Sequence, residues 1–319
     1  MPTETVIEKI PIAISSCLLG EEVRFDGGHK HNAYITQTLG EYFEYTAFCP
    51  EVAIGLGIPR PTIQLVQIED GIRVRGSKDP RIDVTEQLQA YARSVVPALE
   101  AYCGYILKRA SPSCGMERVK VYKNGTPAGT SSGVYAAVIM QALPELPVEE
   151  EGRLMDPVLR ENFIERVFVY HRWQQFKHSG FTAAGLVQFH TVHKFTLLAH
   201  DEIIYRELGQ LVANLDSADM AVLAHQYGQR MMQALSKPAT RKTHTNVLMH
   251  ILGYVKDSLT AEDKQELLDI LDKYRLGQVP LIVPITLLKH YLRRFPDDYI
   301  KQQVYLNPHP DELMLRNSL

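Results

Sequence analysis

The sequence predicts an α/β fold with an open, mostly parallel, Rossmann-like sheet, followed by an all-α helical region. From residue 10 to about residue 142, short runs of β-branched and aromatic residues alternate with helical patterns, which is typical of strands joined by crossover helices. After residue 156 the strand signals nearly vanish and helical periodicity takes over. At 319 residues the chain is long enough to bury two cores.

The first half is predicted element by element from periodicity and turn residues. Three strands of the sheet are expected over 10–16, 42–48 and 105–110. Two helices are expected over 83–101 and 133–143. Two further extended pieces are predicted, a hairpin of 63–68 with 72–74 across Asp70-Gly71 and a segment over 119–122 before the turn Asn124-Gly125.

A boundary is predicted near residues 144–152, where two prolines, a glycine and an acidic run have the composition of an exposed connection. It separates an α/β domain over 1–146 from an all-helical domain over 152–319. Asp156 is a good N-cap residue and Pro157 suits the first helical position. The expected helices lie near 157–176, 182–199, 201–214, 218–235, 240–257, 261–275 and 285–294.

Composition narrows the class of protein. Lys plus Arg number 34 against 37 Asp plus Glu, so the net charge of −3 gives no global attraction for nucleic acid or anionic membrane. No stretch approaches about 18 unbroken apolar residues, so we expect no membrane association. Four cysteines are too few for a disulfide scaffold and suit a reducing compartment, which predicts a cytoplasmic protein. We infer no obligate protein partner.

Three of the four cysteines follow predicted strands. Cys17 and Cys49 end the first two, and Cys114 lies four residues past the third. Ligands of open α/β sheets bind beyond the carboxyl ends of strands, so these thiols are expected to meet there. Thiolates select soft metals, and three without a fourth suit either a zinc ion with an open position or an iron–sulfur cluster with one iron not held by protein. Cys103 lies at a helix-to-strand junction and is expected to be an inert buried residue.

The motifs around these cysteines resemble the thiouracil desulfidase family over about residues 10–142. In chain order they are Ser16-Cys17-Leu18-Leu19-Gly20, Val23-Arg24-Phe25-Asp26-Gly27, Cys49-Pro50-Glu51-Val52, Pro59-Arg60 and Ser111-Pro112-Ser113-Cys114-Gly115. The remainder resembles the helical domain of uncharacterised function that is fused to such desulfidases in the RNA 4-thiouridine desulfidase type.

The resemblance implies a [4Fe-4S] cluster on Cys17, Cys49 and Cys114, with its fourth iron open to the sulfur of a thiocarbonyl. It also implies that Glu51 and Ser111 are the catalytic acid–base pair. The plainer interpretation of Glu51 is a carboxylate that caps the helix after Pro50. Ser113 is the alternative if Ser111 is only a turn former, and it is also a candidate for substrate binding.

Further substrate-binding candidates come from two loops. Arg24 and Asp26 are suited to fix the polar edge of a pyrimidine, although Asp26-Gly27-Gly28 is equally typical of a simple turn. Ser132 and Gly133 open the closing helix, where backbone N–H groups can hold an anion or a base carbonyl. A cap is the commoner role of such a Gly/Ser run.

The helical half carries clustered basic residues that suit an RNA phosphate backbone, against the plainer interpretation of a solvated helical face. The RNA-binding candidates are Lys237, Arg241, Lys242, Lys289, Arg293 and Arg294. A third basic group is Arg172 with Lys177 and His178, and Trp173, Phe176 and Tyr291 are expected to be available for stacking. His190, His193 and His200 also have helical spacing for a metal, but packed, hydrogen-bonded histidines are the more ordinary case.

These observations lead to one expected function and two alternatives. The expected protein is a non-redox desulfidase that converts 4-thiouridine in tRNA to uridine with release of hydrosulfide, with thiolated tRNA as its partner. One alternative is a desulfidase of free thiouracil or thionucleosides. The other is a noncatalytic, metal-stabilised RNA-binding module.

Overall fold

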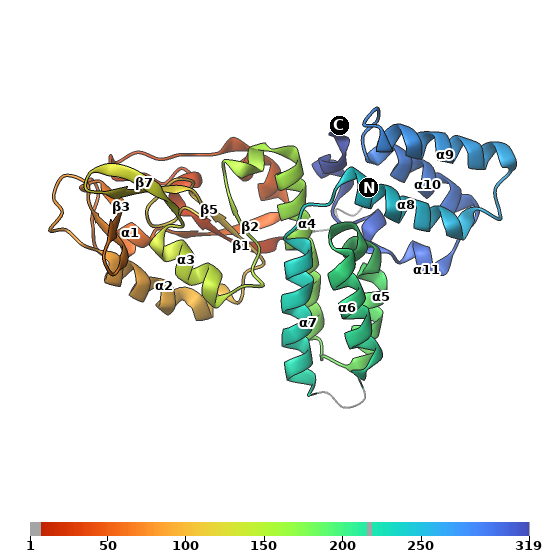
Figure 1. Cartoon of the computed structure of the whole chain (residues 1–319), viewed down its shortest axis with the longest axis horizontal. Helices are drawn as coiled ribbons and strands as arrows, with labels where there is room; N and C mark the ends of the chain where they lie inside the picture. Colours follow the sequence, from red (N-terminus) through yellow and green to blue (C-terminus); the bar gives the residue numbers. More distant parts are fainter. Residues whose placement is uncertain (1–7, 216–218, 319) are drawn as a thin grey trace, which may run out of the picture. The chain divides into compact units, whose positions relative to one another are not determined.

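The computed structural model describes residues 8–215 and 219–318. These residues fall into two compact units that divide after Asp156. The first unit contains the strands and the second is helical (Figure 1). In the described part of the chain, no helix combines the length and the hydropathy needed to cross a membrane.

The first unit is centred on a four-stranded parallel sheet. Its strands stand in the order β2-β1-β5-β8 and are β1 (Ile10–Ser15), β2 (Phe43–Phe48), β5 (Tyr105–Leu107) and β8 (Val148–Glu150). All three pairings are parallel. The open, mostly parallel sheet predicted from the sequence is therefore confirmed.

A second, mixed sheet accompanies the first. Its strands, in the order β4-β3-β6-β7, are β3 (Ile63–Ile68), β4 (Gly71–Gly76), β6 (Val119–Lys123) and β7 (Thr126–Ser131). The two predicted turns close antiparallel hairpins, and β3 pairs with β6 in parallel. Buried side chains of this sheet, among them Leu65, Val74 and Val121, form one apolar cluster with Leu88.

The helices of this unit are α1 (Pro50–Ala53), α2 (Thr85–Leu99) and α3 (Val134–Ala142). The longer two run side by side, and Tyr91 of α2 stacks on Tyr135 of α3 with ring centroids 5.8 Å apart (Figure 1). The Tyr135 hydroxyl lies 3.0 Å from that of Tyr105 in the central strand β5. Aromatic packing thus ties both helices to the parallel sheet.

The prediction that residues 144–152 form an exposed connection is wrong for the acidic part of this segment. Val148, Glu149 and Glu150 form the edge strand β8 and are buried. Arg153 Nε donates to Glu149 Oε1 over 2.6 Å, and the Met116 backbone N–H donates to Glu150 Oε1 over 2.8 Å. Because these partners compensate the buried carboxylates, the acidic run can join a sheet instead of standing in solvent.

The second unit is built from helices. In chain order they are α4 (Pro157–His178), α5 (Ala183–His200), α6 (Glu202–Ala213), α7 (Met220–Leu235), α8 (Arg241–Val255), α9 (Ala261–Arg275), α10 (Ile282–Arg294) and α11 (Asp298–Lys301). The predicted start of α7 at residue 218 lies outside the described residues. The all-helical prediction is otherwise confirmed.

Sequence signals explain why these helices begin where they do. The side chains of Thr182, Asp201, Asp219, Thr240 and Thr260 each accept a backbone N–H of the following helix, as N-cap residues do. Buried faces of α5, α8, α9 and α10 meet in one apolar core that includes Leu198, Leu248, Leu267 and Leu288. Caps and apolar periodicity therefore agree, which is why the predicted boundaries lie close to the observed ones.

Candidate active site

Three cysteines line one cavity of about 380 Å³ in the first unit. Cys17 lies in the turn after β1, Cys49 lies between β2 and α1, and Cys114 lies in the loop after β5. Strands β2, β1 and β5 are neighbours in the parallel sheet, so their carboxyl ends come together. Cys103 precedes β5, at the other end of this strand, and does not line the cavity.

The three thiols are withdrawn from water. Cys17 and Cys114 are buried and Cys49 is partly buried. Burial raises the pKa of Cys17 to about 11 and also raises the pKa values of Cys49 and Cys114, because a thiolate loses its hydration there. The Lys108 ammonium acts in the opposite direction on the Cys17 pKa, but the burial effect is larger. A soft cation is the partner that such buried sulfurs fit best.

The arrangement of the thiols bears on the kind of metal group. Across residues 8–215 and 219–318, no three His, Cys, Asp or Glu side chains converge closely enough to hold one metal ion. A zinc ion draws its sulfurs to about 2.3 Å, whereas the thiolates on an iron–sulfur cluster bind different irons and stand further apart. Three thiols around one cavity fit a cluster whose irons they would bind separately.

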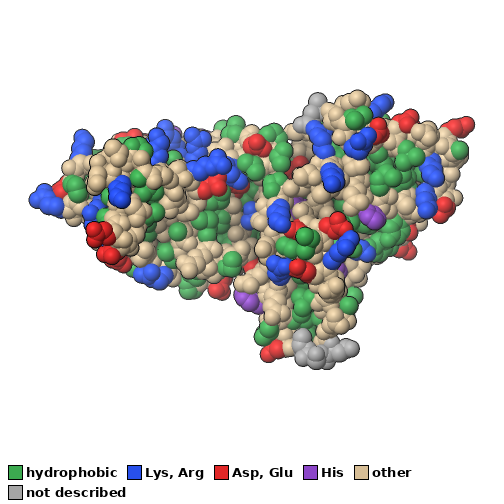
Figure 2. Space-filling model, in the orientation of Figure 1, with side chains coloured by type: hydrophobic (Ala, Val, Ile, Leu, Met, Phe, Trp, Pro, Cys, Tyr) green, Lys and Arg blue, Asp and Glu red, His purple; other side chains and the backbone are tan. Residues whose placement is uncertain are grey.

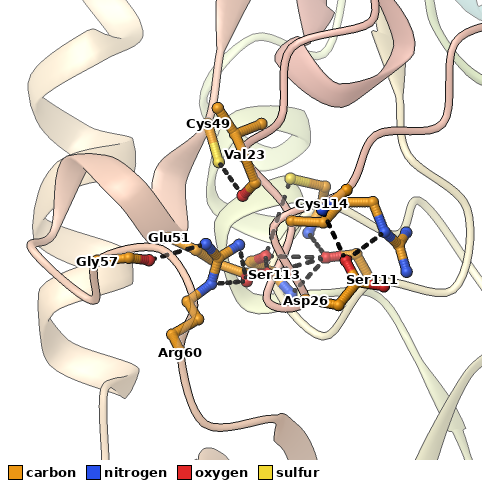
Figure 3. A network of polar contacts seen from close by, with 11 residues as sticks. Val23, Asp26, Cys49, Glu51, Gly57, Arg60, Ser111, Ser113 and Cys114 are labelled. Atoms are coloured by element: carbon orange, nitrogen blue, oxygen red, sulfur yellow. Dashed lines mark hydrogen bonds and ion pairs between the residues drawn. The ribbon is translucent and has the colours of Figure 1, made fainter.

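Glu51 is held by a buried arginine that the sequence analysis assigned no role. Arg60 Nε and Nη2 both donate to Glu51 Oε2, over 2.9 and 2.7 Å, and Nη1 donates to the Gly57 carbonyl over 3.1 Å (Figure 3). The Arg60 side chain is only 3% exposed. Cys49 is the N-cap residue of α1, and Glu51 stands in the first turn of this helix, where its carboxylate pairs with Arg60. Its second oxygen, Oε1, faces the serine loop.

Two serines connect Glu51 to the Cys114 loop. Ser113 Oγ donates to Glu51 Oε1 over 2.5 Å, and Ser111 Oγ donates to the same oxygen over a longer 3.4 Å. The two hydroxyl oxygens lie 2.9 Å apart (Figure 3). Ser111 lines the cavity, whereas Ser113 is fully buried behind it. The structure therefore brings together both serines that the sequence proposed.

The loop fixes Ser111 relative to Cys114. The Cys114 backbone N–H donates to Ser111 Oγ over 3.1 Å, and the Gly115 N–H donates to the Ser111 carbonyl over 2.8 Å. Ser113 Oγ lies 3.8 Å from Cys114 Sγ. One short loop thus sets the positions of a thiol, two hydroxyls and, through Ser113, the carboxylate of Glu51.

Basic and aromatic side chains line the remainder of the cavity. Lys30 and Arg109 contribute cationic groups. Arg24 and Lys108 also line it, paired with Asp26 over 3.5 Å and with Glu151. Phe25 is 39% exposed, with the Arg24 guanidinium 5.3 Å from its ring centroid. The cavity combines sulfur, a carboxylate, hydroxyls, cations and a stacking face.

Four predicted substrate-binding residues do not line this cavity. One is Ser113, which is buried behind it. Asp26 is exposed and accepts the Gly28 backbone N–H over 3.1 Å, as in a turn. Ser132 and Gly133 lie at the start of α3. Three backbone N–H groups at this helix start, those of Gly133, Val134 and Ala136, donate to carbonyls of the Cys114 loop, which are those of Gly115, Pro112 and Ser113. These N–H groups are therefore already hydrogen-bonded within the protein.

Arg60 was missed as a functional residue, although it lies in a motif quoted for the resemblance. Its significance depends on burial and on a partner nine residues away, neither of which periodicity reveals. Lys30 and Phe25 were also missed. A basic and an aromatic residue close after Cys17 were the available signal, but the sequence does not show which of them turn toward the cavity.

The RNA-binding candidates of the helical unit differ in their surroundings. Lys237 pairs with Asp201, Lys289 lies 3.6 Å from Asp311, and the Arg241 guanidinium lies over the Tyr274 ring. Lys242, Arg293 and Arg294 are exposed. On the face shown in Figure 2, blue side chains of this unit are interspersed with red and green ones instead of forming one patch.

The expectation that aromatic side chains of this unit are available for stacking is wrong for two of the three residues. Trp173 has no exposed surface and Tyr291 is 3% exposed, because both pack in the helical core. Arg172 donates to the Pro308 carbonyl over 2.7 Å, so its guanidinium is used inside the unit. Apolar periodicity placed these rings correctly on helices but did not show which side of each helix is covered.

The three spaced histidines have ordinary hydrogen-bond partners. His190 Nδ1 lies 3.1 Å from the Tyr227 hydroxyl, and His193 Nδ1 lies 2.8 Å from the Phe189 carbonyl. His200 Nε2 lies 3.3 Å from Glu165 Oε2. The packed-histidine interpretation therefore holds for the part of the chain that the structure describes, and a metal site on them is absent there.

Comparisons with known proteins agree with this division of the chain. Residues 12–151 match the family described as 2-thiouracil desulfurase, and residues 194–310 match DUF1722, a family of unknown function. An uncharacterized protein of Escherichia coli K12, YbgA, is 36% identical over 48% of this chain and 91% of its own length. The uncharacterized Bacillus subtilis 168 protein YbbK is 34% identical over 41% of this chain and 90% of its own length.

One solved structure is also similar in sequence. It is the [4Fe-4S]-dependent thiouracil desulfidase TudS, which is 30% identical over 46% of this chain and 95% of its own, with a TM-score of 0.38.

Proposed function

Residues 12–151 of this chain belong to the 2-thiouracil desulfurase family, and from this premise we propose that the protein is a non-redox desulfidase of thiopyrimidine bases. The observation that carries the proposal is the shared cavity, in which three cysteine thiols meet a carboxylate and a serine hydroxyl. Soft sulfur ligands and a proton acceptor are the two components that hydrolysis of a carbon–sulfur double bond requires.

Cys17, Cys49 and Cys114 would hold a [4Fe-4S] cluster at the carboxyl ends of β1, β2 and β5. When bound, the cluster would supply an open iron, a soft Lewis acid that polarises a thiocarbonyl group. The protein contributes the shape of the cavity and its proton chemistry.

Glu51 is the group best placed to take a proton from water. Its carboxylate lines the cavity, and Arg60 compensates its charge from the buried side through two donors to Oε2. Because Arg60 donates only to Oε2, the other oxygen, Oε1, can accept hydrogen bonds from the serines and from groups in the cavity. Orientation of the base by a third group is a general feature of acid–base sites.

Ser111 and Ser113 would carry protons between Glu51 and the substrate. Ser111 lines the cavity and its hydroxyl lies within 2.9 Å of Ser113 Oγ, which in turn donates to Glu51. A proton taken by Glu51 can return through this pair to a ring nitrogen or to the departing sulfur. Water supplies the new carbonyl oxygen, the carbon–sulfur bond breaks, and sulfur leaves as hydrosulfide, so no external electron donor is needed.

We further propose that the physiological substrate is 4-thiouridine in tRNA. Arg24, Lys30 and Arg109 line the cavity together with the half-exposed ring of Phe25. Cations near a stacking face suit a base that is attached to a phosphate backbone, whereas a free thiobase offers them no anionic partner. These side chains favour RNA over free thiouracil.

Anaerobic reconstitution of the full chain tests the proposal. Iron and sulfide are counted per chain, and hydrosulfide release is followed with thiolated tRNA, 4-thiouridine and free thiouracil. We expect about four irons per chain, turnover, and loss of both in Cys17→Ala, Cys49→Ala or Cys114→Ala, with both retained in Cys103→Ala. Absence of turnover on all three substrates by iron-loaded protein would contradict the desulfidase proposal. Faster turnover of the free base than of tRNA would contradict the RNA assignment alone.

A further inference from the structure

We propose that Lys108, held in place by Glu151, supplies the positive charge that compensates the three thiolates of the site and the hydrosulfide that the reaction releases. The two residues stand at the carboxyl ends of neighbouring strands, Lys108 directly after β5 and Glu151 directly after β8. Lys108 lines the thiol cavity. The inference deepens the proposed function and rests on it for the cluster and for hydrosulfide as the product.

Neighbouring strands fix the backbone of Lys108 from both sides. Its N–H donates to Ser15 Oγ over 2.9 Å, and Ser15 is the last residue of β1, two positions before Cys17. On the other side, the Glu151 backbone N–H donates to the Leu107 carbonyl over 3.2 Å. Lys108 therefore stands between the strand that leads to Cys17 and the edge strand β8.

The Glu151 carboxylate holds the Lys108 side chain at the cavity. Its Oε1 accepts from Lys108 Nζ, and its Oε2 accepts the Arg109 backbone N–H over 2.7 Å. Lys108 Nζ also donates to the Arg109 carbonyl over 3.0 Å. The side chains of Lys108 and Glu151 are only 17% and 14% exposed. Because two protein acceptors hold the ammonium group, its charge stays at the cavity instead of moving into solvent.

The ion pair presents its positive end to the thiols. Burial has the largest effect on the Cys17 pKa, and among the charged groups that act on it Lys108 has the largest effect and lowers it. Glu151 has a smaller effect of the opposite sign. The pair therefore produces a positive potential at Cys17, which favours an anion there.

Negative charge gathers at this edge of the sheet. Cysteines ligate iron as thiolates, and hydrosulfide is a further anion when it is released into the same cavity. Two of the three thiols are buried, so water compensates these charges poorly. A fixed cation stabilises the anionic product more than a neutral thiocarbonyl substrate, and its contribution therefore grows as the carbon–sulfur bond breaks.

The reduction potential of the cluster tests the inference without turnover, because it depends on the net charge around the cluster. In full-length, reconstituted protein, Lys108→Gln should lower the potential by about 59 mV, the one-electron equivalent of a tenfold change. Lys108→Arg should keep the wild-type potential. So should Lys120→Gln, which removes an exposed lysine of β6 that does not line the cavity. An unchanged potential in Lys108→Gln would overturn the inference.

Ligand binding separates the effect of charge from an effect on the shape of the cavity. Sodium hydrosulfide and thiourea, a neutral thiocarbonyl, are titrated anaerobically into the same proteins, and the visible absorption of the cluster is followed. Lys108→Gln should weaken hydrosulfide binding about tenfold, as expected for the loss of one nearby unit charge, and change thiourea binding by less than about twofold. Equal weakening of both ligands would overturn the inference.

A double variant decides the case in which Lys108→Gln binds too little iron to be measured. Lys108→Gln with Glu151→Gln removes both charges and leaves neither unpaired. Because the ammonium acts on Cys17 more strongly than the carboxylate does, the potential should still fall, but by less than in Lys108→Gln alone. A potential at or above the wild-type value would overturn the inference.

The same preparations keep the two proposals distinguishable. If cluster-loaded wild type turns over no thiolated substrate while Lys108→Gln lowers both the potential and the hydrosulfide affinity, the desulfidase proposal fails and the charge role of Lys108 stands. If thiolated substrate is turned over while both quantities are unchanged in Lys108→Gln, the role of Lys108 fails alone. A wild-type chain that binds no iron would contradict both.

Discussion

A Cβ atom added to Gly133 would lie 2.5 Å from the Ser113 carbonyl oxygen, so α3 begins in direct backbone contact with the loop that carries Cys114. The Ala136 N–H donates to the same carbonyl over 3.0 Å. Helix α3 therefore supports the loop that carries Cys114 and the two serines. The glycine is required by the closeness of two backbones, since any side chain would have to displace the loop.

Gly133→Ala should disturb the thiol site from outside it. The new methyl group would also meet the Ser111 carbonyl at 2.9 Å, and backbone atoms cannot move aside as a flexible side chain can. We expect a loss of about 1–3 kcal/mol in unfolding free energy, the usual cost of overpacking, with fewer irons bound per reconstituted chain. Calorimetry and iron analysis measure these two quantities.

Gly40→Ala is the matched control. A Cβ on Gly40 would stand 3.6 Å from its nearest neighbour, which is ordinary contact. It should keep full iron loading. Wild-type iron content in Gly133→Ala would show that the loop adapts and that the contact does not position Cys114.

Arg60 and Glu51 should behave as a coupled pair. Arg60→Met leaves a carboxylate whose side chain is only 13% exposed without its cation, and the cost should approach the about 3–5 kcal/mol known for broken buried pairs. The double variant, Glu51→Gln with Arg60→Met, should lose less free energy of unfolding than the two single variants lose in sum. Calorimetric unfolding of the four proteins in this cycle gives the coupling free energy.

An exposed ion pair provides the comparison for that cycle. Arg81 donates to Asp79, but its side chain is 90% exposed, so Arg81→Met should produce no measurable change in stability. Strict additivity of the Glu51 and Arg60 substitutions would mean that the pair has no energetic role.

The two serines should act as one unit in catalysis. Ser113→Ala removes the 2.5 Å donor to Glu51, and Ser111→Ala removes the hydroxyl that lines the cavity. Each should lower kcat by about 10²- to 10⁴-fold, the range of general acid–base effects, with iron content unchanged. If protons pass through both hydroxyls in sequence, the double variant should be no slower than the slower single one. Multiplicative losses would indicate independent roles.

The parallel sheet and the convergence of three thiols could be predicted because both follow from local patterns. Each cysteine lies within a few residues of a strand end, and parallel strands end at the same edge of a sheet. Strand β8 could not be predicted in this way. Glu149 and Glu150 are buried only because Arg153 and the Met116 N–H reach them, and charge in a sequence ordinarily indicates exposure.

Contacts within the candidate site are also difficult to predict from the sequence. Ser111 and Ser113 were both identifiable, but which of them lies closer to Glu51 depends on the distance between helix α1 and a loop about 60 residues further along the chain. Trp173 gives a second example, in the helical unit. Because basic residues neighbour it in the sequence, its ring was predicted to be exposed at the surface. The ring is packed against Phe189 and Tyr227, with centroids 5.2 Å away, and helical periodicity alone did not reveal that burial.

Acid should destabilise the helical unit through its buried histidines. Burial lowers the pKa values of His193 and His244 to about 3. In the unfolded chain each titrates near about 6.5, so below that pH the unfolded state binds protons that the folded state does not. The free energy of unfolding therefore falls with falling pH, by up to about 1.4 kcal/mol per pH unit for each histidine. The raised His200 pKa acts in the opposite direction, so a comparison of variants is needed to isolate one residue.

His193→Gln isolates one of these contributions. The chain has one tryptophan, Trp173, which is buried in the helical unit, so its fluorescence in urea reports unfolding of that unit. The variant should be less stable than wild type at pH 7.5, and the difference should shrink by about 1.4 kcal/mol at pH 5.5, one unit below the unfolded pKa. Leu248→Val, which removes a buried methylene and no titrating group, should show the same difference at both pH values. If the His193→Gln difference were equally constant, the residue would not be held neutral by its burial.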